Sequence, residues 1–132
     1  MQNEFELHAA RAFFASAWAD QMEENGHSLR GEIMDQMPSE IDPGAIEYAR
    51  LLRKRIERDN GKTIAQLMEY IEKHGDGDRP NDLEMFGHYA AMQAMGHGVG
   101  LGDAFGYEVR GAIKVPYIEF GMHNLEREYG EA

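Results

Sequence analysis

The stretch "NEFELHAARAFFASAWADQMEEN", residues 3–25, decides the fold because it contains neither proline nor glycine and Gly26 follows it directly. Alanines and long side chains favour a helix over this length, and glycine is the residue that most often ends one. Apolar side chains lie on two opposite faces of this helix, Phe5, Ala9, Ala12 and Ala19 on one and Leu7, Phe14 and Trp18 on the other. A helix that is apolar on two sides needs partners on both. We therefore expect residues 3–25 to form the central helix of the fold.

Two further helices follow from start and stop signals in the middle of the chain. Asp42 is a suitable N-cap and Pro43 a suitable first helical residue for a helix that runs to about Asn60. Thr63 can cap a second helix, whose apolar residues recur at the i, i+3, i+4, i+7 spacing and which ends near Gly75. The two segments together predict a helical hairpin.

The remaining helical segments are bounded by prolines and by a polar loop. Ser28 can begin only a short helix before Pro38 interrupts it. The stretch "GDGDRPND", residues 75–82, is rich in polar and helix-breaking residues and is typical of a surface loop. Either of its last two residues can cap a helix that runs through about Met95.

Extended structure is favoured after the last of these helices. The stretch "IKVPYIEF", residues 113–120, is rich in β-branched and aromatic residues, although Pro116 restricts it to an edge, a strand start or a bulge. We predict a mainly α fold of the α+β class, a compact helical domain with a small C-terminal β element. A chain of 132 residues is expected to form a single domain over 1–132, with a helical part to about residue 75 and the C-terminal elements over about 82–132.

The net charge of the chain limits the partners that it can attract. Twenty-four acidic against 13 basic side chains give a net charge of −11, which disfavours direct binding to DNA or to anionic membranes and favours a partner protein with a basic surface. No stretch reaches membrane-spanning length, and Glu4 and Glu6 fall where a signal peptide needs an apolar run. With no cysteine, the chain has neither disulfides nor thiolate ligands. We expect a soluble, cytoplasmic protein whose oligomeric state the sequence leaves open.

Positive charge is concentrated in residues 50–62. Six of the 13 basic side chains lie there against two carboxylates, so this stretch has a net charge of +4 and the rest of the chain −15. Arg50, Lys54 and Arg58 project from the side of their helix opposite to its apolar stripe. Two interpretations follow: a solvated helix face that balances an acidic neighbour, or a local contact to an anion or RNA.

The densest group of chemically informative residues is "GHYAAMQAMGHGVGLGD", residues 87–103. Glycines at 96, 98, 100 and 102 allow positive φ angles and a close approach of main-chain amides to a bound group. Convergent amides form anion sites, so the segment is a candidate binding site for a nucleotide-like anion, with Arg110 adding charge. The candidate ligand-binding residues are Gly96, His97, Gly98, Gly100, Gly102 and Arg110.

His88, His97 and Asp103 are the candidate catalytic residues. Two imidazoles and a carboxylate also match the ligand types of zinc, iron or manganese, but the spacing matches no known metal motif, so no metal or other cofactor is predicted. A second interpretation makes His97 a general base oriented by Asp103. A third is structural, in which these side chains cap the helix end and bond to the loop backbone.

The pattern Gly87-His88, Gly96-His97-Gly98, Gly100, Asp103 resembles one carried by small uncharacterised proteins of bacteriophage and mobile-element genomes. The resemblance covers roughly residues 86–120 and implies a phage-type protein without implying a reaction. It leads, with the acidic charge, to our first functional hypothesis: an accessory protein that acts by binding, as an anti-CRISPR-like inhibitor of a host defence or nucleic-acid-handling complex in the host cytoplasm. The alternatives are a protein that sequesters a nucleotide-like anion and a small His/Asp enzyme, with or without a metal.

The sequence also predicts how the glycine-rich segment is built. Val99, Leu101 and Phe105 are apolar and can pack on the helices, so we expect an ordered loop instead of a disordered spacer. This loop is expected to turn the chain from the preceding helix into the short strand, with His97 and Asp103 at its rim. If Gly98 or Gly100 needs positive φ, its replacement by valine is expected to destabilise the fold.

Overall fold

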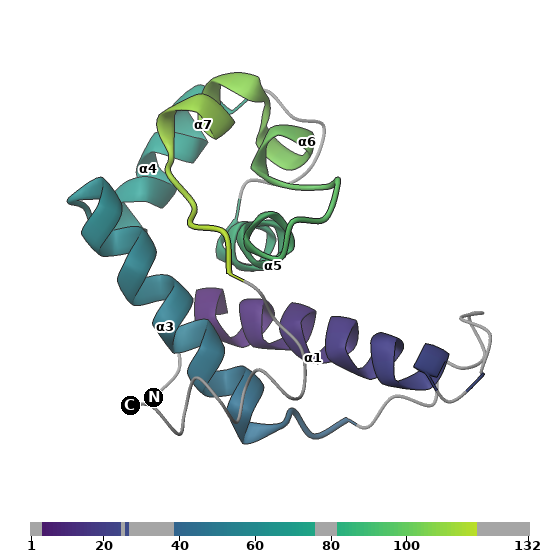
Figure 1. Ribbon diagram of the computed structural model, residues 1–132. Helices are drawn as coiled ribbons and strands as arrows, with labels where there is room; N and C mark the ends of the chain where they lie inside the picture. Colours follow the sequence, from purple (N-terminus) through teal and green to yellow (C-terminus); the bar gives the residue numbers. More distant parts are fainter. Residues whose placement is uncertain (1–3, 25, 27–38, 76–81, 119–132) are drawn as a thin grey trace.

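The computed structural model describes residues 4–24, 26, 39–75 and 82–118 (Figure 1). These residues form six α-helices, α1 (Glu4–Glu24), α3 (Pro43–Asn60), α4 (Ile64–His74), α5 (Leu83–Ala94), α6 (Leu101–Phe105) and α7 (Tyr107–Ala112). All six contribute to one cluster of buried apolar side chains. The mainly helical fold that the sequence predicts is confirmed, whereas the short helix expected between Ser28 and Pro38 lies outside the described residues.

Helix α1 packs against α3 on one side and against α5 on another, as expected for a central helix (Figure 1). Phe13 meets Tyr48 of α3 edge to face, with ring centroids 5.0 Å apart, and Phe5 meets Phe86 of α5 in the same way at 4.9 Å. All four rings are buried or nearly so. Such edge-to-face pairs add to the free energy gained by burying the rings.

The crossing of α1 and α5 is close because a glycine lies at the contact. Gly87 is buried in α5, and a Cβ atom at this position would lie only 2.3 Å from the carbonyl oxygen of Phe5. The neighbouring small residues Ala9 and Ala90 are fully buried. The backbones of the two helices therefore approach to a distance that no other residue at 87 would allow without movement.

The ends of α3 and α4 follow the signals in the sequence. The carboxylate of Asp42 accepts a hydrogen bond of 3.0 Å from the backbone N–H of Gly44, and Gly61 ends α3 in the left-handed conformation with φ 62°. Thr63 and Gln66 form a reciprocal capping box at the start of α4. These local bonds satisfy donors that a helix end would otherwise expose.

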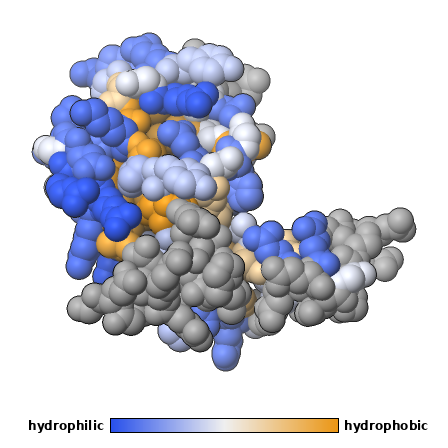
Figure 2. Space-filling view, viewed as in Figure 1, coloured by the Kyte–Doolittle hydropathy of each residue, from blue (hydrophilic) through white to orange (hydrophobic). Residues whose placement is uncertain are grey.

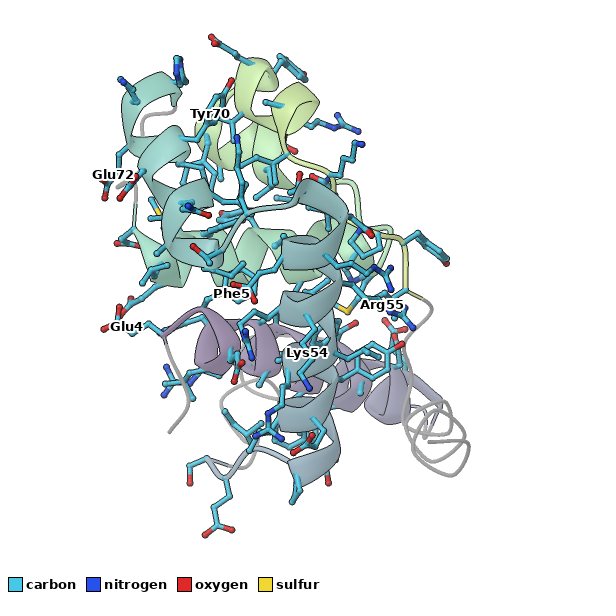
Figure 3. All side chains as sticks on the ribbon, turned by 90° about the vertical axis from the view of Figure 1, so that its left-hand side faces the viewer. Glu4, Phe5, Lys54, Arg55, Tyr70 and Glu72 are labelled. Atoms are coloured by element: carbon cyan, nitrogen blue, oxygen red, sulfur yellow. The ribbon has the colours of Figure 1, made fainter. Side chains whose placement is uncertain are left out.

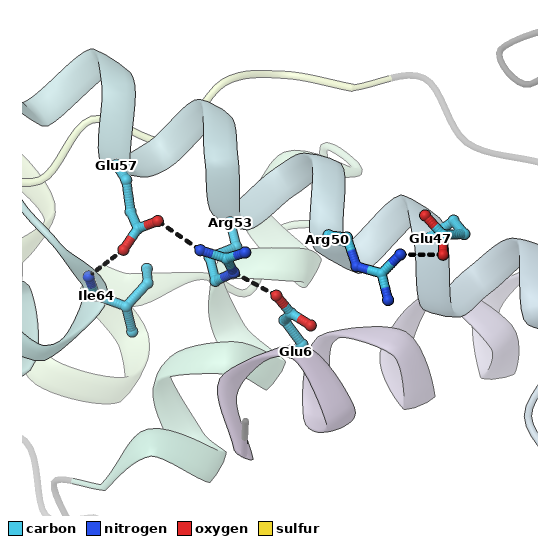
Figure 4. A network of polar contacts seen from close by, with 6 residues as sticks. All are labelled: Glu6, Glu47, Arg50, Arg53, Glu57 and Ile64. Carbon is cyan, nitrogen blue, oxygen red and sulfur yellow. Dashed lines mark hydrogen bonds and ion pairs between the residues drawn. The ribbon is translucent and has the colours of Figure 1, made fainter. Parts of the chain in front are cut away.

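A polar network connects α1, α3 and α4 at the edge of the apolar interior (Figure 4). Arg53 of α3 donates to the buried carboxylate of Glu6 on α1 and, over 2.7 Å, to Glu57 one turn along α3. The other oxygen of Glu57 accepts the N–H of Ile64 at 2.8 Å and so caps α4. The hydrogen bond with Glu6 raises the pKa of Arg53 above its ordinary value. Arg53 thus differs from the basic residues of α3 that project into solvent.

The chain leaves α5 differently from the predicted loop and strand. After residues 96–100 it forms the short helices α6 and α7, which bury Leu101, Phe105 and Val109 completely. Val99 was expected to pack on the core, but it is 40% exposed. The two short helices were missed because glycines within and beside them hide the apolar spacing.

No strand forms over residues 113–118, and residues 119–120 of the expected strand lie outside the described part of the chain. The extended backbone bonds to a side chain and a helix end instead of to a neighbouring strand. Asn60 accepts from the N–H of Lys114 at 2.9 Å and donates to the carbonyl of the same residue at 2.8 Å. The N–H of Ile118 donates to the carbonyl of Ala94 at 2.7 Å. The small C-terminal β element is therefore not present in these residues, because the partners of their backbone groups are not strands.

The surface around the extended segment is mostly hydrophilic. Viewed as in Figure 1, apolar atoms reach the surface as a narrow strip between the polar surfaces of the surrounding helices (Figure 2). Tyr107 and Tyr117 are the most exposed aromatic side chains among the described residues, at 79% and 71%. No helix within the described ranges combines the length and the apolar character needed to cross a membrane.

Candidate functional site

An open groove of about 380 Å³ lies along the edge of the α1–α5 interface. Helix α1 provides Ala12, Ala15, Ser16, Ala19 and Asp20, and the α5 side provides His88, Met92 and His97. Carbon atoms form most of its surface, and polar groups lie at a few positions. Helix α1 extends beyond α5 here, with pale orange, weakly hydrophobic atoms along it (Figures 1 and 2).

The way α5 ends places His97 beside this groove. Gly96 has a φ angle of 80°, and its N–H donates to the carbonyl of Gln93 at 3.0 Å. The N–H of His97 donates to the carbonyl of Met92 at 3.1 Å. These two bonds make the Schellman arrangement, in which a left-handed glycine reverses the chain and satisfies the last carbonyls of a helix. The ring of Tyr117 covers Gly96, so a Cβ there would lie 2.8 Å from it.

His97 reaches across the groove to α1. Its Nε2 atom lies 3.3 Å from Oγ of Ser16, 81 positions earlier in the chain, and the tautomer of the ring decides which atom donates. Both side chains are accessible from solvent, with Ser16 partly and His97 largely exposed. The contact joins the end of α5 to the half of α1 that α5 does not cover.

His88 lies on the side of α5 that faces away from the core, and it is exposed in the groove. Its ring stands edge to face on Tyr89, with centroids 5.0 Å apart and planes at 86°. The structure therefore brings two of the three candidate catalytic residues, His88 and His97, to one groove.

Asp103 has a different partner. Its carboxylate accepts the N–H of Gly100 at 3.0 Å and closes the first turn of α6, as the structural interpretation expected. The described residues contain no group of three or more His, Asp or Glu side chains close enough to hold a metal ion. His88, His97 and Asp103 thus form no such group. A histidine that acts as a general base also needs another residue to orient its ring. Asp103, which is predicted to orient His97, is instead bonded to the backbone of Gly100.

The backbone amides of the glycine-rich loop are largely occupied. Four donate within the protein: Gly96 N to Gln93 O, His97 N to Met92 O, Gly100 N to Asp103 Oδ2, and Leu101 N, over 3.0 Å, to Gln93 Oε1. A carboxylate and an amide oxygen of the protein therefore stand where a bound anion would accept these bonds. Arg110 does lie against the loop, since a Cβ at Gly102 would be 3.0 Å from its Cδ.

Of the four glycines at 96, 98, 100 and 102 that allow positive φ, only Gly96 adopts it. Among the described glycines beyond residue 90, positive φ occurs at Gly96 and Gly106, not at Gly98, Gly100 or Gly102. Gly106 separates α6 from α7 at φ 102°. Neither Gly98 nor Gly100 needs positive φ, because the chain reverses immediately at the end of α5, one residue before His97.

Sequence reasoning missed the contribution of α1 to the site. Ser16 and Asp20 lie in its second half and were not selected, because neither belongs to a local motif. One signal was available: Ala12, Ala15 and Ala19 are small residues spaced to share one side of a helix. No family model, curated protein or solved structure matches this chain.

Proposed function

We propose that this chain is a small accessory protein of the bacteriophage type that acts by binding a partner protein with a basic surface. In this proposal it inhibits a defence or nucleic-acid-handling complex in the cytoplasm of the host cell, as a counter-defence protein does. The glycine–histidine pattern supports the phage setting, and the charge of the surface supports the chemistry of the partner. The observation that carries the proposal is that a group of glutamates lies on one edge of the molecule, whereas the basic side chains are concentrated on α3.

The basic charge of α3 is partly neutralised within the protein. Three of its arginines pair with carboxylates. Arg50 pairs with Glu47, and Arg53 with Glu6 and Glu57 (Figure 4). Arg58 pairs with Asp59. These pairs leave fewer free cations on α3 than its sequence suggests. The positive stretch thus corresponds better to a helix face balanced by its neighbours than to a nucleic-acid contact, which needs several free cations.

Three glutamates lie on another edge of the molecule, defined here as the acidic edge of Glu4, Glu72 and Glu84. The labelled side chains Glu4 and Glu72 point outward along the same side in Figure 3, whereas Lys54 and Arg55 point elsewhere. Glu84 belongs to this edge because its carboxylate lies 3.5 Å from His8 near the start of α1. Complementary charge of this kind speeds the encounter with a basic partner and excludes acidic ones.

The two alternative functions receive less support from the geometry. A nucleotide-like anion would compete with Asp103 for the amide of Gly100. An enzyme with His97 as base would lack the orienting carboxylate in the predicted place. Ser16 is a hydroxyl within hydrogen-bond distance of His97, and a serine within a helix can also donate to the carbonyl four residues earlier.

Affinity capture from a lysate of the bacterial host, at low and at high salt, tests the proposal. The wild-type chain is expected to retain a basic protein at low salt, and Glu72→Lys is expected to retain less of it. Glu23→Lys changes the net charge equally at an exposed position near the far end of α1 and serves as the control. The same three proteins, expressed in the host, are compared for their effect on phage plating. Capture of nothing, or equal loss in both variants, contradicts the proposal.

A further inference from the structure

The interface between α1 and α5 ends before α1 does. One side of α1 carries Phe5, Ala9 and Ala12, which are 0%, 0% and 5% exposed. The same side continues with Ser16 and Ala19, and these are only partly buried, since α5 has already ended. The groove is therefore the continuation of an established helix–helix contact along a stretch of α1 that α5 does not cover.

The surface of this groove has the shape that helix packing requires. Ala12, Ala15, Ser16 and Ala19 follow the i, i+3, i+4, i+7 spacing and place small side chains in one row. Side chains of a second helix enter the grooves beside such a row, and small residues permit the short end of the interaxial range of about 8–10 Å. The packing of α1 on α5 depends on small residues in the same way, with Gly87 at the contact.

The size and the rim of the groove fit a few apolar side chains. Its volume of about 380 Å³ is that of a small binding pocket. Met92 on the α5 side is a flexible apolar residue that adapts to the shape of an incoming group. His88 and His97 provide a polar rim around the alanine floor, which is the common arrangement at the centre of a protein interface.

The negative charge of the protein indicates which kind of helix can bind in the groove. Asp20 is exposed at the end of the groove, and the whole chain carries a net charge of −11. An acidic helix would be repelled from this position, whereas lysine and arginine side chains flanking an apolar stripe would be attracted. The occupant is therefore basic outside its apolar contact.

We propose that the groove between α1 and α5 binds an amphipathic helix of the partner protein, with its apolar side chains on Ala15 and Ala19 and its cations toward Asp20. This inference rests on the proposed function, because it names the site at which the basic partner docks. The mode is helix-in-groove recognition, in which anchors at i, i+3, i+4 and i+7 carry the affinity.

The test is a calorimetric titration with a synthetic helical peptide of leucines at the helical spacing and lysines elsewhere. Wild-type protein is expected to bind it, and Ala15→Arg to bind it at least about tenfold more weakly. The control Ala65→Arg adds the same charge at an exposed position on α4 and is expected to change the affinity less than about twofold. A peptide with alanine for leucine is expected to bind as weakly as Ala15→Arg binds the original. Should Ala15→Arg melt at a lower temperature, Ala19→Gln replaces it.

Three outcomes overturn the inference. The first is equal loss of affinity in the two arginine variants, which would show binding by net charge alone. The second is a wild-type dimer that Ala15→Arg dissociates in sedimentation, because the occupant is then a second copy of the chain. The third is capture of the host partner by wild type and Ala15→Arg in equal amounts. This last result leaves the proposed function intact, whereas capture by neither contradicts the function itself.

Discussion

Replacing Gly87 by alanine is expected to reverse the usual effect of that substitution in a helix. In an exposed helix interior, alanine is about 1 kcal/mol more favourable than glycine. At Gly87, however, the added Cβ would lie 2.3 Å from the carbonyl oxygen of Phe5 and 3.0 Å from its carbon. Carbon and oxygen atoms approach to about 3.3 Å at the shortest, so α1 and α5 must separate by about 1 Å.

The expected loss of stability is large because the new Cβ meets the backbone carbonyl of Phe5, which cannot rotate away as a side chain can. Overpacking costs about 1–3 kcal/mol, and a backbone carbonyl places this case at the upper end. After subtraction of the helix-propensity gain, we expect a net loss of about 2 kcal/mol, and a fall in Tm of about 8 °C for a chain of this size. The separation also weakens the contact of Phe5 with Phe86, whose rings now lie 4.9 Å apart.

Urea denaturation followed by circular dichroism measures this loss, and Gly111→Ala is the matched control. Gly111 lies in α7, and a Cβ there meets no atom within 4 Å. Alanine at this position is expected to stabilise the protein by up to about 1 kcal/mol. If the midpoint of Gly87→Ala rises as that of Gly111→Ala does, the close approach of the two backbones is refuted.

Two further substitutions test other contacts. Arg53→Ala is expected to destabilise the protein by about 2 kcal/mol, because it removes a charged hydrogen bond from the buried carboxylate of Glu6. Arg58→Ala, whose side chain is 73% exposed, is expected to change stability by less than about 0.5 kcal/mol in the same urea titration. Equal effects would show that the network around Arg53 adds nothing. Gly96→Ala is expected to lower Tm because φ there is 80° and the new Cβ would meet the ring of Tyr117, whereas Gly98→Ala, with open space around it, is expected to be neutral. A neutral Gly96→Ala would contradict the Schellman end of α5.

Local signals made part of the fold predictable. The bounds of α3 agree with the sequence because Asp42, Pro43 and Gly61 act through bonds within a few residues of each helix end. The start of α5 at Leu83 follows in the same way from Asp82, whose carboxylate accepts the N–H of Met85 at 2.8 Å. Where the capping residue is next to its helix in the sequence, the end of the helix can be predicted from the sequence.

The parts that could not be predicted depend on contacts between distant residues. Lys114 lies in a stretch with strand-like composition, but its backbone groups pair with the side chain of Asn60, 54 positions earlier. Ser16 enters the candidate site only because His97, 81 positions later, is bonded to it. No local pattern encodes either pairing. The roles of Gly96 and Asp103, by contrast, were open to prediction as helix-end devices, and the structural interpretation included that of Asp103.

The packing of α1 on α5 has a consequence for how the protein folds during synthesis. Phe5 leaves the ribosome about 80 residues before Phe86, a delay of about 4–16 s at ordinary elongation rates. Helix α3 is available sooner, so the pairing of Phe13 with Tyr48 is expected to form first. Until α5 arrives, one apolar side of α1 remains open to water and to other chains. The nascent protein thus keeps an apolar side of α1 exposed to aggregation even after α3 has been made, until residues 83–94 complete α5.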